Sequence, residues 1–141
     1  MTGDIVRDVA ALKDRYDLAV IGAGPAGLAA ATLTAKHGLD TVLFDEQPSP
    51  GGQIYRAITE TQVRDPGVLG ADYWQGAALV DRFRASSAQY VPRATVWSVS
   101  RECKIGVSLD GAARLLEAQH VILGTLSMAP SAWKCQRFWM L

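Results

Sequence analysis

Hydrophobic positions along the chain alternate between short apolar runs and stretches of helical spacing. Residues 18–21 and 41–44 are apolar runs with the length of buried strands. Between them, residues 26–37 carry small and apolar side chains on one helical face, and Gly38 stands where a helix commonly ends in glycine. This order of strand, helix and strand predicts an α/β fold with a parallel sheet.

The pattern changes in the second half of the chain. Leu79, Val80 and Phe83 form an apolar stripe, which predicts a helix from about residue 71 to residue 89. Residues 95–99, 105–109 and 114–118 alternate well enough for a three-stranded β-meander, with Asp110 and Gly111 as a turn. The apolar run 119–124 is expected to be a separate final strand.

Composition and charge exclude some classes of function but do not identify the function. One domain is the natural count for 141 residues, and 14 basic against 14 acidic side chains give no footprint for nucleic acid or an anionic membrane. The uncharged stretch 18–35 is broken midway by glycines and a proline, so we expect no membrane span. Residues 1–15 lack the apolar core of a signal peptide, and we expect a short amphipathic helix there and a cytoplasmic protein.

The first apolar run passes directly into Gly22-x-Gly24-x-x-Gly27, the pattern of a loop that cradles a pyrophosphate. Gly22 permits the tight turn, Gly24 lets the backbone approach the ligand, and Gly27 lets the helix pack closely on the strand. A proline suits the first helical turn, and the free N–H groups there favour an anion. The candidate dinucleotide-binding residues of this loop are Gly22, Ala23, Gly24, Pro25, Ala26 and Gly27.

An acid follows the second apolar run at the distance that a dinucleotide-binding unit requires. Asp45 is the predicted ligand of the adenosine ribose hydroxyls, and Glu46 is a rival for the same role. A carboxylate there disfavours a 2′-phosphate, so FAD or NAD is expected rather than NADP. Cys103 and Cys135 lack the spacing of metal ligands, so we expect no metal site, and no side-chain set stands out as catalytic.

Four segments carry a family resemblance: 45–56, 76–80, 95–97 and 121–123. The chain resembles the two-dinucleotide-binding-domain FAD-dependent oxidoreductases, and more closely the amino-terminal FAD-binding part of the large subunit in the group of opine oxidase, hydrogen cyanide synthase and amino-acid dehydrogenase. The resemblance implies a Rossmann-like FAD-binding domain with a parallel sheet and an inserted β-meander, incomplete at its carboxyl end. It favours FAD over NAD because a plain NAD-binding dehydrogenase has no reason to carry a double glycine after its acid.

The resemblance also adds cofactor-binding candidates. It implies that Gly51, Gly52 and Gln53 pass the pyrophosphate and flavin, and that the backbone at Val96 lies beside the adenine, although Val96 could equally be a core residue. It further implies that small residues at the end of the last strand pass close to the flavin. The candidates there are Gly124 and Thr125.

The resemblance ends near residue 125, and the tail after it resembles nothing in the family. We therefore expect an extension at 1–15, a partial FAD-binding domain at 16–125 and a divergent tail at 126–141, which an interrupted reading frame would explain. The implied function is the FAD-binding portion of an oxidoreductase acting on an amino acid or opine. Its implied partners are FAD, a small iron-sulfur protein and a second flavoprotein subunit. The alternatives are an inert or non-enzymatic dinucleotide-binding module and an NAD-binding dehydrogenase.

Overall fold

The structure is a computed structural model that describes residues 4–51, 71–124 and 138–140. Strands and helices follow the expected α/β order, with a short 3₁₀ turn before the first strand. In chain order the elements are η1 (Val9–Ala11), β1 (Arg15–Ile21), α1 (Pro25–Lys36), β2 (Thr41–Phe44), α3 (Ala71–Arg84), β3 (Gln89–Val91), β4 (Thr95–Val99), β5 (Lys104–Leu109), β6 (Ala112–Leu123) and β7 (Phe138–Met140).

The strands form one seven-stranded sheet in the order β3, β2, β1, β6, β5, β4, with β7 paired to β6 off this path. The pairs β2 with β3, β1 with β2 and β1 with β6 are parallel. Ile21 stands opposite both Phe44 and Leu123, so the carboxyl ends of β1, β2 and β6 lie side by side. Ligands of open α/β sheets bind at this edge.

Strand β6 belongs to both parts of the sheet. Its first half pairs antiparallel with β5, and its second half pairs parallel with β1. The prediction of two strands, 114–118 and 119–124, is therefore wrong at their junction, because the strand continues through it. No glycine or proline occurs within β6 to interrupt it. The predicted meander of β4, β5 and β6 is confirmed, and Asp110 and Gly111 turn with φ of 47° and 83°.

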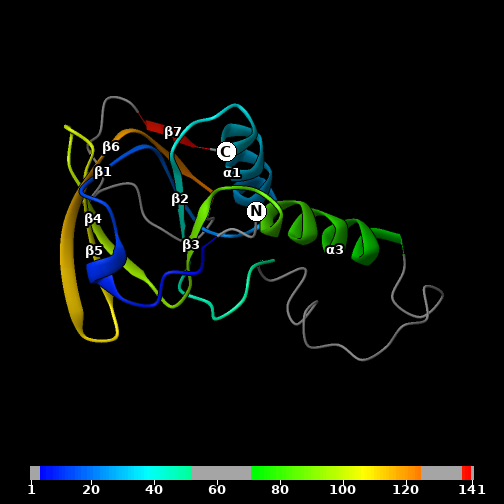
Figure 1. The fold of residues 1–141 in the computed structure, drawn as a ribbon, viewed down its shortest axis with the longest axis horizontal. Coiled ribbons are helices and arrows are strands. Elements are labelled where there is room, and N and C mark those ends of the chain that lie inside the picture. The colour runs from blue at the N-terminus through cyan, green and yellow to red at the C-terminus, as the bar shows by residue number, and fades with distance from the viewer. Residues whose placement is uncertain (1–3, 52–70, 125–137, 141) are drawn as a thin grey trace.

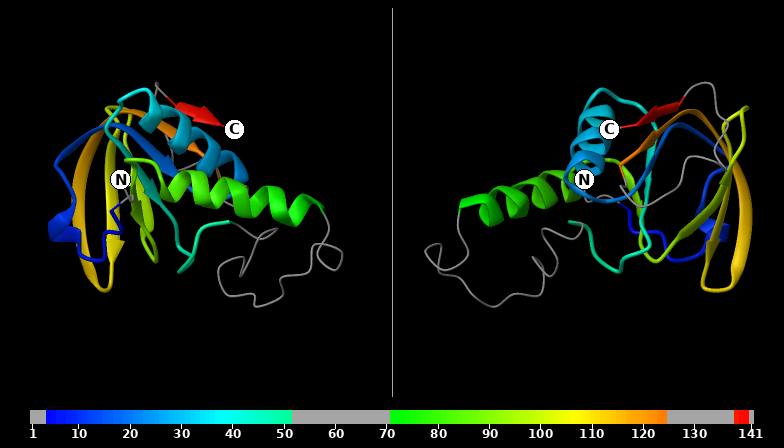
Figure 2. Two further views of the ribbon diagram at one scale, coloured as in Figure 1. Left: turned by 45° about the vertical axis from the view of Figure 1, so that its right-hand side comes forward. Right: turned by 180° about the vertical axis from the view of Figure 1, so that it is seen from behind.

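Two helices cover one face of the sheet. Helices α1 and α3 lie together on that face in Figures 1 and 2, while β4 and β5 curl away on the other side. The core on the helix side includes Leu28 and Ala31 from α1 and the predicted stripe of α3. The small side chains of α1 let the helix approach the strands closely.

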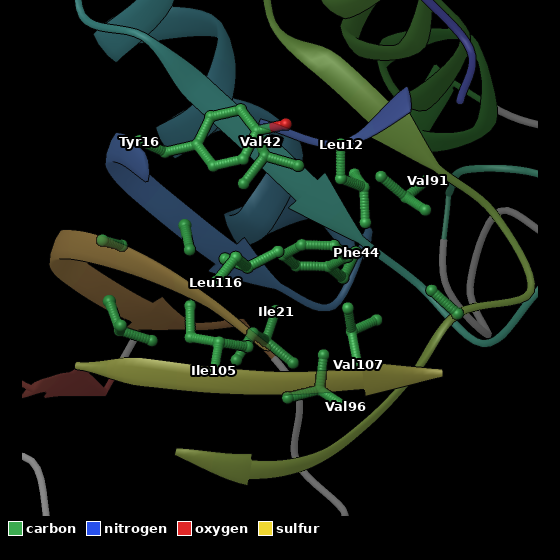
Figure 3. Close-up of a cluster of buried hydrophobic side chains, with 14 of the residues drawn as sticks. Leu12, Tyr16, Ile21, Val42, Phe44, Val91, Val96, Ile105, Val107 and Leu116 are labelled. Carbon is green, nitrogen blue, oxygen red and sulfur yellow. The ribbon is translucent and has the colours of Figure 1, made fainter. Parts of the chain in front are cut away.

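A second core fills the space between the parallel strands and the meander. Figure 3 shows its side chains pointing toward one another from β1, β2, β3, β4, β5 and β6. Phe44, Ile105 and Val107 are each at most 1% exposed. These buried apolar contacts fix the meander against the parallel strands.

Helix α3 is shorter than predicted, and β3 was not predicted. The helix ends at Arg84 instead of residue 89. The Ser86 hydroxyl donates to the Phe83 carbonyl oxygen at 2.6 Å, and serine side chains compete in this way with the helical hydrogen-bond ladder. The chain is then free to enter β3, where Tyr90 pairs in register with Leu43 of β2.

The segment before β1 packs on the sheet instead of forming the expected amphipathic helix. Within residues 4–14, only Val9–Ala11 is helical, and it is a 3₁₀ turn in which the Ala10 N–H donates to the Asp8 carboxylate at 2.9 Å. Val6 and Leu12 are 4% and 3% exposed, so both lie in the core. Backbone hydrogen bonds from Val6 to Tyr90 and from Tyr90 to Asp4 hold the segment against β3.

Part of the divergent tail joins the sheet. Strand β7 pairs in parallel with Val121, Ile122 and Leu123 of β6. Among the residues that the structure describes, no helix is both long enough and apolar enough to cross a membrane.

Candidate functional site

The glycine loop lies at the edge where β1, β2 and β6 end. Gly22 has a φ of 102°, a conformation that favours glycine, and this turns the chain out of β1. Its N–H donates to the Phe44 carbonyl oxygen at 2.8 Å, and the N–H of Gly124 donates to the Ile21 carbonyl oxygen at 2.8 Å. The first bond ties the loop to the end of β2, and the second ties the chain just after β6 to the end of β1.

The glycines of this edge differ in what a side chain would meet. A Cβ on Gly27 would lie 1.9 Å from the Gly22 carbonyl oxygen, so the protein itself requires glycine there. A Cβ on Gly124 would lie 3.0 Å from the Gly27 Cα, which is also very tight. Among the residues that the structure describes, a Cβ on Gly24 would meet only the Gly124 carbonyl oxygen, at an ordinary 3.6 Å. The described part of the fold therefore gives no steric reason for glycine at position 24, whereas the close approach of a ligand would.

Helix α1 starts in the form that suits an anion. Gly24 is its N-cap residue and contributes no side-chain hydrogen bond, Pro25 occupies the first turn, and that turn holds no acidic residue. The N–H groups of a first helical turn have no partner within the helix, and the helix dipole adds positive potential there. Ala26 is exposed and the Gly24 backbone is half-buried, so this end of the helix is open.

Asp45 lies directly after β2, and its environment is unusual for a carboxylate. Burial raises the pKa of Asp45 from 3.8 to about 6, although backbone N–H groups of Gln47, Glu46 and Ala23 favour the charged form. Its Oδ2 is buried and has no hydrogen-bond partner in the part of the chain that the structure describes. Glu46 is exposed. The Asp45 carboxylate interacts with a backbone N–H of the glycine loop, that of Ala23.

The chain returns to the glycine loop at Gly51. This residue has a φ of 130°, and its N–H donates to the Ala23 carbonyl oxygen at 2.9 Å. The structure therefore brings the loop, Asp45, Gly51 and Gly124 to one edge of the sheet. Gly52, Gln53 and Thr125 lie outside the described residues, and their predicted roles stay predictions.

Val96 is a core residue by its side chain. It is 4% exposed and points into the cluster between β4 and the parallel strands (Figure 3). The backbone just before β4 does run beside the acid, because the N–H of Ala94 donates to the Asp45 carbonyl oxygen at 2.8 Å. The predicted position of the Val96 backbone beside an adenine stays a prediction.

Tyr90 is a residue of this region that sequence reasoning missed. It is 5% exposed, and its hydroxyl is the second buried side-chain atom without a hydrogen-bond partner among the described residues. Burial raises the pKa of Tyr90, and the Asp45 charge raises it further. Only the pairing of β3 with β2 brings Tyr90 near Asp45, and the sequence carried no signal for that pairing.

Similarity to known proteins agrees with this arrangement. The family described as NAD(P)-binding Rossmann-like domain matches residues 20–80. An opine oxidase subunit of Agrobacterium tumefaciens (strain Ach5) is 45% identical over 122 residues, which cover 81% of this chain and 24% of that protein. Hydrogen cyanide synthase subunit HcnB of Pseudomonas aeruginosa is 37% identical over 109 residues, which cover 75% of this chain and 23% of that protein.

Solved structures give the same fold at low sequence identity. The myxobacterial chondrochloren halogenase CndH is described as a variant of the FAD-dependent halogenases. Its structure matches with a TM-score of 0.62 at 14% identity, over 83% of this chain and 38% of that chain. The predicted Rossmann-like fold with a parallel sheet and a β-meander is confirmed, and so is the resemblance to the opine oxidase and hydrogen cyanide synthase group. The chain spans about a quarter of the length of these two relatives, at 24% and 23%.

Proposed function

We propose that this chain, whose Rossmann-like domain is related to that of an opine oxidase subunit, is the FAD-binding portion of a flavin-dependent oxidoreductase. The observation that carries the proposal is the glycine at position 24. Its neighbours leave room for a side chain, with the nearest atom 3.6 Å from an added Cβ, yet the chain keeps glycine at the open end of α1. A pyrophosphate in contact with the backbone accounts for that choice.

The residues at this edge of the sheet have the chemistry needed to bind the pyrophosphate and the ribose of FAD. The first turn of α1 would receive the pyrophosphate, since its N–H groups and dipole favour an anion. The Asp45 carboxylate would accept hydrogen bonds from the adenosine ribose, and the N–H of Gly51 holds the end of segment 46–51 against the loop. Gly52, Gln53, Val96 and Thr125 are proposed to extend the same site.

Bound FAD supplies an acceptor for a hydride or an electron pair, and the protein binds and orients it. We propose an amino acid or an opine as the substrate of the whole enzyme, in line with the opine oxidase subunit that the chain resembles. A small iron-sulfur protein and a second flavoprotein subunit are proposed as partners. We assign no catalytic residue within this chain.

The domain limits and the location belong to the same proposal. The FAD-binding domain is proposed to span 16–125, with the segment before it packed on its core and the tail 126–141 following it. A cytoplasmic location is proposed, and cell fractionation with an antibody to the chain would test it.

An NAD-binding dehydrogenase is the main alternative, since the matching family is described as NAD(P)-binding. Asp45 argues against NADP because a carboxylate repels the 2′-phosphate. Gly51 argues for FAD, since its backbone conformation and its bond to Ala23 hold the segment after the acid against the loop. A dinucleotide-binding module without activity is the remaining alternative.

The visible spectrum of the purified chain after incubation with FAD and gel filtration tests the proposal. We expect retained absorption of oxidised flavin, lost in Gly24→Val, whose side chain would occupy the space of the pyrophosphate. Asp110→Ala, at the distant β5 to β6 turn, is the control and should retain the flavin. Absence of flavin absorption from the wild type after gel filtration, or equal absorption from Gly24→Val, would reject the proposal.

A further inference from the structure

Two buried polar atoms have no partner in the described part of the chain, and both lie near the proposed ribose site. They are Oδ2 of Asp45 and the hydroxyl oxygen of Tyr90. Such atoms are uncommon in folded proteins because a buried donor or acceptor that is left unpaired costs stability. One of these groups can only accept when ionised, and the other is a good donor. The pair is therefore chemically complementary.

The strand register places the two groups on the same face of the sheet. Tyr90 stands opposite Leu43, and the N–H of Asp45 donates to the Val91 carbonyl oxygen at 3.1 Å. Asp45 is two residues beyond Leu43, so it lies diagonally from Tyr90 on the helix side. Strand spacing and rise put such Cα atoms about 8 Å apart, a gap that a tyrosine and an aspartate side chain can bridge.

The ring of Tyr90 packs against an aromatic side chain of the helix layer. Its ring meets the edge of Phe83 from α3 at 5.8 Å between centroids, with an interplanar angle of 86°. Phe83 and the sheet hold the ring in place. Burial and the Asp45 charge raise the pKa of Tyr90, while Arg84 opposes this, so the phenol stays protonated and able to donate at neutral pH.

In the structure the two atoms are not hydrogen-bonded to each other. We propose that Tyr90 is the positioning residue of Asp45: after a turn of the ionised carboxylate, the Tyr90 hydroxyl donates a hydrogen bond to its Oδ2. The terminal torsion of an aspartate is broad, so the carboxylate can turn to meet the hydroxyl. The backbone N–H groups of Gln47, Glu46 and Ala23 also favour the ionised carboxylate. This bond would fix the orientation in which the Asp45 carboxylate meets a ribose hydroxyl. This role in binding rests on the proposed function, whereas the bond between Tyr90 and Asp45 does not.

Two measurements on Tyr90→Phe test the proposal. In the unliganded chain, NMR titration of the Asp45 carboxyl carbon should give a midpoint about one pH unit higher than in the wild type, because the ionised form loses a donor. The charges of Glu46 and Arg84 are the same in both proteins. FAD, used as the probe in a fluorescence titration, should bind about tenfold more weakly to the variant.

Tyr16→Phe is the matched control, since it also removes a buried phenol hydroxyl. That hydroxyl has its own partners, Gln89 Oε1 at 2.5 Å and the Lys13 N–H at 3.0 Å. The control should lower the Tm but leave the Asp45 midpoint and FAD affinity at wild-type values. An unchanged midpoint in Tyr90→Phe, or an equal shift in Tyr16→Phe, would overturn the proposal. If the wild type binds no FAD, the proposed function fails while the NMR titration still decides the role of Tyr90.

Discussion

The glycine loop allows stability and ligand binding to be separated by two single substitutions. In Gly24→Ala the new Cβ meets the Gly124 carbonyl oxygen at 3.6 Å, and the residue has an ordinary φ of −71°. Alanine lowers the conformational entropy of the unfolded chain, which stabilises the folded protein by about 0.4–1 kcal/mol. Alanine is also a poorer N-cap residue than glycine, which costs a similar amount of stability. We therefore expect the free energy of unfolding to change by less than about 1 kcal/mol.

Gly27→Ala should behave differently. Its Cβ would lie 1.9 Å from the Gly22 carbonyl oxygen and 3.4 Å from the Val20 side chain, so α1 has to move away from β1. Overpacking of this kind costs about 1–3 kcal/mol, and more when the backbone is the obstacle. The displaced loop should lose FAD binding as well as stability.

Thermal unfolding by circular dichroism and FAD titration on the same preparations would check both variants. Gly24→Ala is expected to have a Tm close to that of the wild type and to bind FAD at least about tenfold more weakly. Gly27→Ala is expected to have both a lower Tm and a lower FAD affinity. Wild-type FAD affinity in Gly24→Ala would refute the assignment of this glycine to the ligand. A stability loss as large as that of Gly27→Ala would refute the steric reasoning.

Three further predictions concern the acid and the core. Asp45→Asn should weaken FAD binding by about 1.5–3 kcal/mol, while Glu46→Gln, at an exposed position, should have little effect in the same titration. Because burial raises the pKa of Asp45 from 3.8 to about 6, the unliganded wild type should lose stability as pH rises through that range, by about 1–2 kcal/mol after allowance for solvent screening. Urea unfolding at several pH values should show this loss in the wild type and its absence in Asp45→Asn. Ile105→Ala should cost about 2–5 kcal/mol in urea unfolding, since Ile105 is 0% exposed, and Thr95→Ala, at an exposed position of β4, should cost less than about 0.5 kcal/mol.

Local signals in the sequence were enough to predict the elements from β1 to Asp45. The glycine loop, α1 and β2 follow from short-range patterns, and the structure gives α1 as Pro25–Lys36 and β2 as Thr41–Phe44. The position of Asp45 at the end of β2 follows from the same patterns. These features could be predicted because each depends on residues close together in the chain.

The features that depend on distant contacts could not be predicted. Strand β3 spans only Gln89–Val91, too short for a periodic signal, and it pairs with β2 and with the segment before β1. The predicted helix before it runs too far, to residue 89, because the pairing of residues 89–91 with β2 is not part of the local pattern. Tyr90 was missed for the same reason, since its place beside Asp45 follows from strand register alone.

The sequence predicted candidate residues for the site, but not the environment of each residue. The motif indicated three glycines with separate roles, but only the folded backbone distinguishes Gly24, where a side chain fits, from Gly27, where none does. The burial of the Asp45 carboxylate also depends on the fold around it. Environment of this sort is a property of packing, which a linear pattern does not contain.

A calorimetric titration of the purified chain with FAD, repeated with NAD and with NADP, distinguishes a flavin site from a nicotinamide site. We expect saturable binding of FAD at neutral pH, stronger than that of NAD, and no binding of NADP, whose 2′-phosphate meets the Asp45 carboxylate. FAD binding should also be lost in Gly24→Val. Absence of FAD binding by the wild type, or a preference for NADP, would contradict the assignment of this edge of the sheet to FAD.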